Sequence, residues 1–315
     1  MYNKLPAPPA GTSLEGKIVI VTGGNSGIGF DCARQIVQLQ VSRLIITSRD
    51  KKRGEEAASK LRAGTRGKGI VEMWLLDMCS PDSVQQFARK VECECPRLDI
   101  AILNAGLSKT HFDIIEGTGY EECFQVNYLS TMLLVIPLLP VPKHRSTPGE
   151  PARLTLISSG TVYLSKFLGN PPSSLLKAFR DPSTAPQTDM PVYSTSKIYG
   201  IMFIDRLAQH ISPNDVIINL ADPGGTKGTE FGRDLPRIAQ VIGLPVINLI
   251  ARSVIDAAHA YLDAALCLTN MLPLPLPSYP DILYTDKGKQ AIENLWEEIL
   301  NEFESVNSRA ILASL

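Results

Sequence analysis

The sequence predicts a single α/β domain that is doubly wound around a mostly parallel central sheet, and three observations predict it. Short runs of β-branched and other apolar residues alternate with segments of helical character along most of the chain. The run at residues 18–21 is apolar at every position, as in a strand that is buried on both faces of a parallel sheet. A glycine-rich turn separates this run from the first expected helix, at residues 30–40.

The first half of the chain continues this alternation. The run RLIITS at residues 43–48 follows one helix, as a parallel βαβ unit requires, and therefore predicts the second strand. A polar helix is expected at residues 51–62 and a third strand at residues 70–76. A helix at residues 82–93 then leads to the fourth strand, LDIAIL at residues 98–103.

The second half of the chain has longer helices and an irregular segment. A long helix is expected at residues 121–139 and a fifth strand at residues 153–158. Residues 160–191 hold several prolines and few periodic apolar positions, which predicts an irregular excursion over the mouth of a site. A helix at residues 192–211 leads to a sixth strand at residues 216–220.

The last part of the chain is expected to cover the site and then close the domain. Residues 225–252 predict a helical lid with an apolar face, and a helix follows at residues 253–267. Prolines then exclude regular structure until a short strand near residues 282–284 and an amphipathic helix at residues 288–304. The apolar residues of the lid could contact a lipophilic substrate or pack onto the core, and the sequence leaves both open.

Composition limits the partners of this chain. Residues 17–315 form one expected domain, preceded by an N-terminal tail at residues 1–16. Lys and Arg number 31 against 32 Asp and Glu, a net charge of -1, which does not favour a nucleic-acid partner. The six cysteines lack the spacing of a metal site, so we expect reduced thiols, no metal and a cytoplasmic location. Prolines interrupt the longest apolar runs, so no membrane span is expected.

The glycine-rich turn is the clearest functional signal in the sequence. Gly23, Gly27 and Gly29 stand where the chain must turn tightly, admit a phosphate to the backbone and let a helix pack against the sheet. The free N–H groups and the positive dipole end at the start of that helix favour a pyrophosphate. With a strand before it and a helix after it, the turn predicts a dinucleotide site.

Arg49 ends the second strand, about 20 positions past the glycines, where a bound dinucleotide would place its adenosine ribose. An acidic residue at this point accepts hydrogen bonds from both ribose hydroxyls of NAD. A guanidinium offers no acceptor but pairs well with a 2′-phosphate, so Arg49 favours NADPH. The alternative is an arginine that is merely exposed.

Four side chains could support hydride transfer to a carbonyl, which needs a proton donor for the carbonyl oxygen. Tyr193 and Lys197 are four positions apart on one helix, so the ammonium would lie near the phenol and lower its pKa. Ser159 could donate to the substrate oxygen or cap the following turn. Asn127 lies in mid-helix, where its amide could bond a backbone carbonyl, hold a relay water or make a buried structural hydrogen bond.

With these motifs in order, the chain resembles the short-chain dehydrogenase/reductase superfamily over essentially its full length. The sequence TGGNSGIG at residues 22–29 matches the cofactor motif T-G-x-x-x-G-x-G of the compact subfamily. The other matches are Asp77 at the adenine position, Asn104-Ala105-Gly106, the catalytic tetrad Asn127, Ser159, Tyr193 and Lys197, and Pro223-Gly224 before the nicotinamide pocket.

The resemblance implies a Rossmann domain that binds NADPH/NADP+, in which Tyr193 protonates the carbonyl oxygen and Ser159 holds it. Lys197 would bind the nicotinamide ribose and lower the pKa of Tyr193, and Asn127 would anchor a water relay to Lys197. The cofactor-binding residues that it implies are Gly23, Asn25, Ser26, Gly27, Ile28, Gly29, Arg49, Asp77, Asn104, Ala105, Gly106, Tyr193, Lys197, Pro223, Gly224 and Thr226. It also implies homodimers or homotetramers, formed through the helices that hold Asn127 and Tyr193.

Two features depart from the common pattern of the superfamily. Many relatives have Thr five positions after Pro223, where this chain has Gly228, so either Thr226 or Thr229 is left to contact the nicotinamide. The interval between the serine and the tyrosine of the tetrad is long, and a late Leu-Trp-Glu-Glu helix occurs at residues 295–298. The long interval, the Arg-Asp pair at residues 49–50 after the second strand and the late helix look like the retinol-dehydrogenase-like branch, which includes fungal secondary-metabolite reductases.

The expected function is NADPH-dependent reduction of a ketone or aldehyde on a lipophilic small molecule. An NADP-dependent alcohol dehydrogenase that works oxidatively fits the same residues, because they do not fix the direction. A dinucleotide-binding regulatory protein without chemistry is the alternative from another class, and the complete tetrad argues against it.

Overall fold

The computed structural model describes residues 5–65, 69–141, 150–165, 174–183, 191–228, 251–266 and 280–315. In these ranges a six-stranded sheet has the strand order β3-β2-β1-β4-β5-β6, and all neighbouring strands are parallel. The strands are β1 (Ile18–Val21), β2 (Arg43–Ser48), β3 (Ile70–Leu75), β4 (Ile100–Leu103), β5 (Ala152–Ile157) and β6 (Val216–Ala221). The strand order reverses between β1 and β4, so the predicted doubly wound sheet is confirmed.

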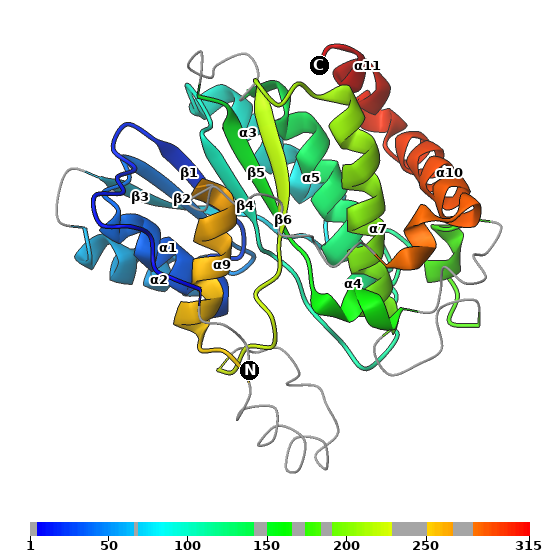
Figure 1. Cartoon of the computed structure of the whole chain (residues 1–315), viewed down its shortest axis with the longest axis horizontal. Helices are drawn as coiled ribbons and strands as arrows, with labels where there is room; N and C mark the ends of the chain where they lie inside the picture. The colour runs from blue at the N-terminus through cyan, green and yellow to red at the C-terminus, as the bar shows by residue number, and fades with distance from the viewer. Residues whose placement is uncertain are drawn as a thin grey trace.

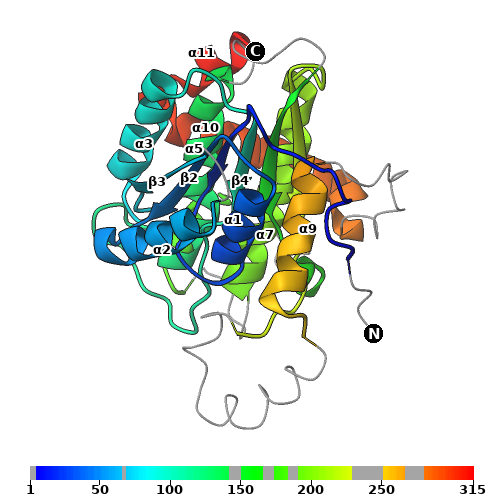
Figure 2. The ribbon, with the colours of Figure 1, turned by 90° about the vertical axis from the view of Figure 1, so that its left-hand side faces the viewer.

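Helices cover both faces of the sheet (Figure 1). One face carries α1 (Gly27–Gln38), α2 (Lys51–Ala63) and α9 (Val254–Leu266), with α1 and α9 side by side (Figure 2). The other face carries α3 (Pro81–Glu94), α5 (Ser130–Leu138) and α7 (Pro191–Leu207). Ile18 and Ile20 of β1 face the second layer, and Val19 and Val21 face the first, which explains why every position of this strand is apolar.

The predicted long helix at residues 121–139 is interrupted. A short α4 (Glu122–Phe124) leads into a π-helical turn at Gln125–Leu129, and α5 begins only at Ser130. Such a turn inserts one residue into the helix and is frequent at functional sites. Here it contains Asn127.

The predicted strand at residues 282–284 is wrong. Asp281–Tyr284 form a 3₁₀ turn that leads directly into α10 (Asp286–Glu302). Thr285 caps this helix by accepting a hydrogen bond from the Gly288 N–H at 3.1 Å. The backbone of Gly288 packs against the Ile282 carbonyl, so the segment is folded onto the helix start and cannot extend as a strand.

Two C-terminal helices complete the α5 and α7 side of the molecule. In Figure 1, α10 runs beside α7, and α11 (Ser308–Ala313) lies at the end of α5. Trp296 of α10 packs its ring against Phe203 of α7, with ring centroids 5.2 Å apart, and stacks on His210 at 5.1 Å. Part of α7 is therefore covered by α10, and one end of α5 by α11.

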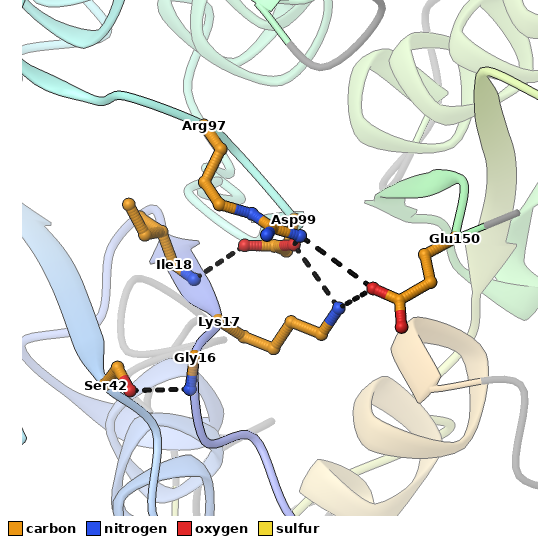
Figure 3. Close-up of polar contacts among 7 residues, drawn as sticks. All are labelled: Gly16, Lys17, Ile18, Ser42, Arg97, Asp99 and Glu150. Atoms are coloured by element: carbon orange, nitrogen blue, oxygen red, sulfur yellow. Dashed lines mark hydrogen bonds and ion pairs between the residues drawn. The ribbon is translucent and has the colours of Figure 1, made fainter. Parts of the chain in front are cut away.

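A polar network fixes the amino-terminal edge of the sheet (Figure 3). Asp99, just before β4, accepts a hydrogen bond from the Ile18 N–H at 2.8 Å and pairs with Arg97. Lys17 lies 3.6 Å from the Asp99 carboxylate and 2.6 Å from Glu150, which precedes β5. These contacts hold the starts of β1, β4 and β5 together, so that the opposite ends of the same strands share one edge.

The segments outside the sheet are only partly described. Residues 5–16 lie against the domain, where Leu14 is 4% exposed and the Leu5 carbonyl contacts His259 of α9. Residues 166–173 and 184–190 of the expected excursion, and residues 229–250 of the expected lid, lie outside the described residues. None of the helices within the described ranges combines the length and hydrophobicity that crossing a membrane requires.

Candidate active site

The glycine-rich turn forms a close-packed cradle between β1 and α1. Gly23 and Gly27 adopt positive φ angles of 62° and 56°, which side chains rarely allow. A Cβ on Gly29 would clash with the Asn104 amide and lie 2.6 Å from the Gly23 carbonyl. Ser26 is the first residue before α1, and its side chain makes no capping bond to the helix. The first N–H groups of α1 and the lack of side chains in the cradle fit a pyrophosphate, and so a dinucleotide.

Asn104 connects this turn to the end of β4. Its Nδ2 donates to the Thr22 carbonyl at 2.8 Å and lies 3.4 Å from the Gly23 carbonyl. The Ala105 N–H donates to Thr22 Oγ1 at 3.0 Å. The two motifs of the sequence, TGGNSGIG and Asn-Ala-Gly, are therefore one structural unit.

Arg49 and Asp77 follow the ends of the neighbouring strands β2 and β3. Both carry charges that act on the Cys79 thiol, whose pKa is raised to about 12, first by burial and then by Asp77, against the lowering effect of Arg49. Asp77 Oδ1 accepts the Cys79 N–H at 2.9 Å. Arg49 is exposed, and its neighbour Asp50 caps α2 by accepting the Arg53 N–H at 2.9 Å.

Tyr193, Lys197 and Ser159 meet at the carboxyl-terminal edge of β5. Lys197 Nζ donates to the carbonyl of Ile157, the last residue of β5, at 2.7 Å, and lies 5.6 Å from the centre of the Tyr193 ring. Ser159 accepts hydrogen bonds from the Thr161 N–H at 3.3 Å and from the Thr161 hydroxyl at 3.1 Å. Its hydroxyl thus caps the following turn, and it also interacts with the Tyr193 phenol.

Burial is the main influence on the pKa values of Tyr193 and Lys197. Burial raises the pKa of the Tyr193 phenol well above its ordinary value, and the hydrogen bond with Ser159 opposes this effect only in part. Burial also lowers the pKa of Lys197 to about 8. The sequence predicts a lowered Tyr193 pKa through Lys197. In this structure desolvation is the largest influence on the Tyr193 pKa and outweighs any lowering by Lys197.

Asn127 uses its amide to hold the loop after Asn104-Ala105-Gly106. Its Oδ1 accepts the Leu107 N–H at 2.9 Å, and its Nδ2 donates to the Leu107 carbonyl at 2.8 Å. The same Nδ2 lies 3.3 Å from the Ser196 hydroxyl, which donates to the Tyr193 carbonyl at 2.7 Å. Of the uses that the sequence leaves open for this amide, the structure shows a bond to a backbone carbonyl and a link to α7.

A small cavity with both polar and apolar residues in its wall lies beside Asn127 and Lys197. Its volume is about 20 Å³, more than the roughly 10–15 Å³ that one water molecule needs. Asn127, Lys197, Ser158 and Ser196 supply polar groups to its wall. The cavity could therefore hold one hydrogen-bonded water between Asn127 and Lys197.

The turn after β6 adds residues to which the sequence interpretation assigned no role. Asp222 Oδ1 accepts the Gly224 N–H at 2.8 Å, and its Oδ2 lies near Gly160, next to Ser159. The Asp222 charge raises the pKa of both Tyr193 and Lys197. Its position directly before Pro223-Gly224 was the available signal.

Thr226 and Arg252 hold the two ends of the expected lid side by side. They form an isolated parallel bridge, and the Lys227 N–H donates to the Arg252 carbonyl at 3.0 Å. The Thr226 hydroxyl donates to the Gly224 carbonyl at 3.0 Å. Thr229, the other candidate for the nicotinamide contact, lies outside the described residues.

The glycine turn, Asn104, the tetrad and Pro223-Gly224 thus lie along one edge of the sheet, from β1 to β6. Arg49 and Asp77 lie on the other side of the glycine turn at the same edge, after β2 and β3. In the described part of the chain, no group of three or more His, Cys, Asp and Glu side chains is arranged to hold a metal ion.

Known proteins resemble this chain in sequence. Residues 17–150 match the family model for short chain dehydrogenases. The chain is 42% identical over 315 residues to the short chain dehydrogenase/reductase mfmJ of Annulohypoxylon moriforme, covering 98% of this chain and 90% of that protein. It is 37% identical over 319 residues to the short chain dehydrogenase virL of Hypocrea virens, covering 98% of this chain and 92% of that protein.

Solved structures resemble it in fold. A short-chain dehydrogenase from Sphingobium yanoikuyae in complex with NADPH matches with a TM-score of 0.61 at 22% identity, covering 88% of this chain and 94% of that one. A short chain dehydrogenase from Shigella flexneri complexed with NADP matches with a TM-score of 0.57 at 20% identity, covering 81% and 92%. At these identities the likeness concerns the fold.

Proposed function

The chain belongs to the short-chain dehydrogenase/reductase family, and from that premise we propose that it uses NADPH to reduce a ketone or aldehyde group on a lipophilic small molecule. Membership makes it an oxidoreductase that binds a nicotinamide dinucleotide. The direction, the preference for NADPH and the substrate class are the parts that we propose.

The observation that carries the proposal is the meeting of Ser159, Tyr193 and Lys197 at the end of β5, beside the cradle. When bound, the cofactor supplies the hydride. Tyr193 donates its phenolic proton to the carbonyl oxygen, and the Ser159 hydroxyl holds that oxygen by a hydrogen bond. Lys197 would hold the nicotinamide ribose and would return a proton to the Tyr193 phenolate, and a water in the cavity beside Asn127 would then replace the proton that Lys197 has lost.

The protonation state of Tyr193 suits the reduction of a carbonyl. Because burial raises the pKa of its phenol, Tyr193 holds its proton at neutral pH, as a proton donor must. The same tyrosine would take the proton back in the oxidation of an alcohol, so the direction depends on the ratio of NADPH to NADP+ and is part of the proposal.

Arg49 and Asp50 support NADPH over NADH. Asp50 is the only acidic side chain at the end of β2 among the described residues, and its carboxylate is engaged in capping α2. Arg49 is exposed beside it and can pair with a 2′-phosphate. Asp77 would then bind the adenine, and the cradle residues 23–29 the pyrophosphate.

Tyr163 and Tyr284 suggest an aromatic rim for the substrate. Their side chains are 50% and 52% exposed, and the Tyr163 phenol lies within electrostatic range of both Tyr284 and Asp222. With the apolar sequence of the expected lid, these rings favour a substrate that buries apolar surface.

The test is the oxidation of NADPH with a panel of aromatic and aliphatic ketones and aldehydes. We expect turnover of at least one compound, and we expect Tyr193→Phe to lower kcat by about 10²–10⁴-fold while NADPH binding is retained. Tyr128→Phe is the matched control, because this buried phenol has no hydrogen-bond partner in the described part of the chain. Full turnover by Tyr193→Phe would overturn the mechanism, and NADPH binding without turnover would favour a regulatory protein.

A further inference from the structure

Tyr261 is a buried residue of α9 with a single directed contact. Its side chain is 2% exposed, and its phenol donates to Asn104 Oδ1 at 3.0 Å. The sequence interpretation did not single it out, because it lies in no motif and more than 150 positions away from its partner. The helix that carries it lies along α1 (Figure 2).

The bond to Tyr261 completes the hydrogen bonding of the Asn104 amide. The oxygen of the amide accepts from α9, and its nitrogen donates to the Thr22 and Gly23 carbonyls of the turn after β1. Three separate elements therefore meet at one amide. Without the phenol, the buried oxygen would lack this donor, and the amide could rotate away from the turn.

The position of this amide matters because the turn has no side chains of its own to support it. The Gly29 backbone packs directly against Asn104 Nδ2, and Gly23 lies within contact of Asn104 and Ala105. A pyrophosphate bound here would be held by backbone N–H groups, whose positions must be fixed before binding if affinity is to be high.

We propose that Tyr261 is a positioning residue for the cofactor turn: its phenol fixes the Asn104 amide, which in turn fixes the carbonyls of Thr22 and Gly23 and preorganises the turn for the dinucleotide. This role rests on the proposed function only in that the cradle binds NADPH. It also connects the cofactor turn to α9, the helix that directly follows the expected lid.

The first test is Tyr261→Phe, which removes only the hydroxyl. We expect the Kd for NADPH, followed by nicotinamide fluorescence, to rise about fivefold, the effect of losing one typical buried hydrogen bond. We expect kcat at saturating NADPH to stay within about twofold, because Tyr261 does not touch the reacting atoms. Tyr128→Phe is the control, with an unchanged Kd, because it removes a buried phenol that lacks a partner among the described residues.

The second test asks whether Tyr261 acts through Asn104. In an Asn104→Ala background, Tyr261→Phe should cause no further increase in Kd. Additive effects, or a Kd that stays unchanged while thermal stability falls, would overturn the positioning role.

Hydrogen exchange of the ligand-free protein separates this inference from the proposed function. Tyr261→Phe should accelerate exchange of the amides of residues 23–29, whether or not any carbonyl compound is turned over. If the unsubstituted protein fails to bind NADPH, the proposed function fails, and exchange at the turn still decides the role of Tyr261. Unchanged exchange there would refute it.

Discussion

Asp222 adds a negative charge to a site whose pKa values are shifted mainly by burial, and the sequence did not indicate this charge. Its carboxylate lies beside Gly160 and raises the pKa of Tyr193 and Lys197. A negative charge beside a phenol disfavours the phenolate, so Asp222 keeps Tyr193 protonated to higher pH.

We therefore expect Asp222→Asn to shift the pH dependence of reduction. Reduction is lost as the pH rises through the pKa of Lys197, which burial lowers to about 8, because the neutral amine no longer returns a proton to Tyr193, whose own pKa lies far higher. Removing the negative charge lowers the pKa of Lys197, so the alkaline limb of the kcat profile should move to lower pH. Asp205→Asn, on an exposed part of α7, changes the net charge equally and should leave the limb in place. A limb that does not move in Asp222→Asn would contradict this account.

We expect Arg49 to determine the preference for NADPH over NADH. We expect Arg49→Ala to raise the Kd for NADPH by about tenfold and to leave the Kd for NADH nearly unchanged, because only the 2′-phosphate loses a charged partner. Fluorescence titration with both cofactors measures this. Lys60→Ala removes an exposed positive charge from α2 and is the control. Equal loss of both affinities would mean that Arg49 supports the strand end and not the phosphate.

At the level of elements, α10 holds the described part of the irregular segment before α7 by hydrogen bonds. Glu298 accepts hydrogen bonds from the Leu175 N–H at 2.9 Å, the Leu176 N–H at 2.9 Å and the Ser174 hydroxyl at 2.8 Å. The turn that follows places Phe179 on the ring of Phe124, with centroids 3.8 Å apart. One carboxylate of the late Leu-Trp-Glu-Glu segment thus anchors a loop more than 120 positions earlier.

Glu298→Gln should loosen this loop, because an amide retains only one acceptor oxygen for three donors. Hydrogen bonds to charged groups contribute about 1.5–3 kcal/mol each, so exchange of the Leu175 and Leu176 amides should accelerate at least about tenfold. Hydrogen exchange with mass spectrometry measures this. Glu297→Gln, at the exposed neighbouring position that pairs with Arg309, should leave exchange unchanged. Equal protection in both variants would exclude Glu298 as the anchor.

For the whole molecule, α10 and α11 occupy the surface through which the family resemblance implies dimers. All described side chains of α5 are buried except Pro137, which is partly exposed. Arg206 of α7 pairs with Glu293 of α10 at 3.0 Å, and Trp296 covers Phe203. A partner's helices could reach α5 and α7 only if α10 and α11 were displaced.

We therefore expect the full chain to be a monomer in solution. Light scattering after size exclusion, at micromolar concentration, should give a mass near 34.3 kDa. The reason is that the apolar area of these helices is already buried within one chain, which leaves little driving force for pairing. A mass of twice or four times this value would support the homodimer or homotetramer expectation through a different surface.

A structural feature could be predicted from the sequence where its cause is a pattern of neighbouring residues, and not where its cause is a contact between distant segments. The strands were predicted within one or two residues because a strand buried on both faces leaves an apolar run that is local in sequence. The π-helical turn at Asn127 was missed, because the apolar pattern of residues 121–139 runs through it and its side-chain partner, Leu107, lies on another segment. The strand predicted at residues 282–284 failed because the cap of α10 folds that segment back.

The sequence by itself determined the parallel doubly wound sheet, the glycine turn and the family, since each depends on residue types at short, fixed spacing. Only the tertiary structure decided that burial raises the pKa of Tyr193, that Asp222 lies beside the serine of the tetrad, and that Tyr261 holds Asn104. The reason is physical: desolvation, charge and hydrogen bonding depend on distance in space. These pairs are far apart in the chain and meet only because parallel strands end at one edge and helices pack across them.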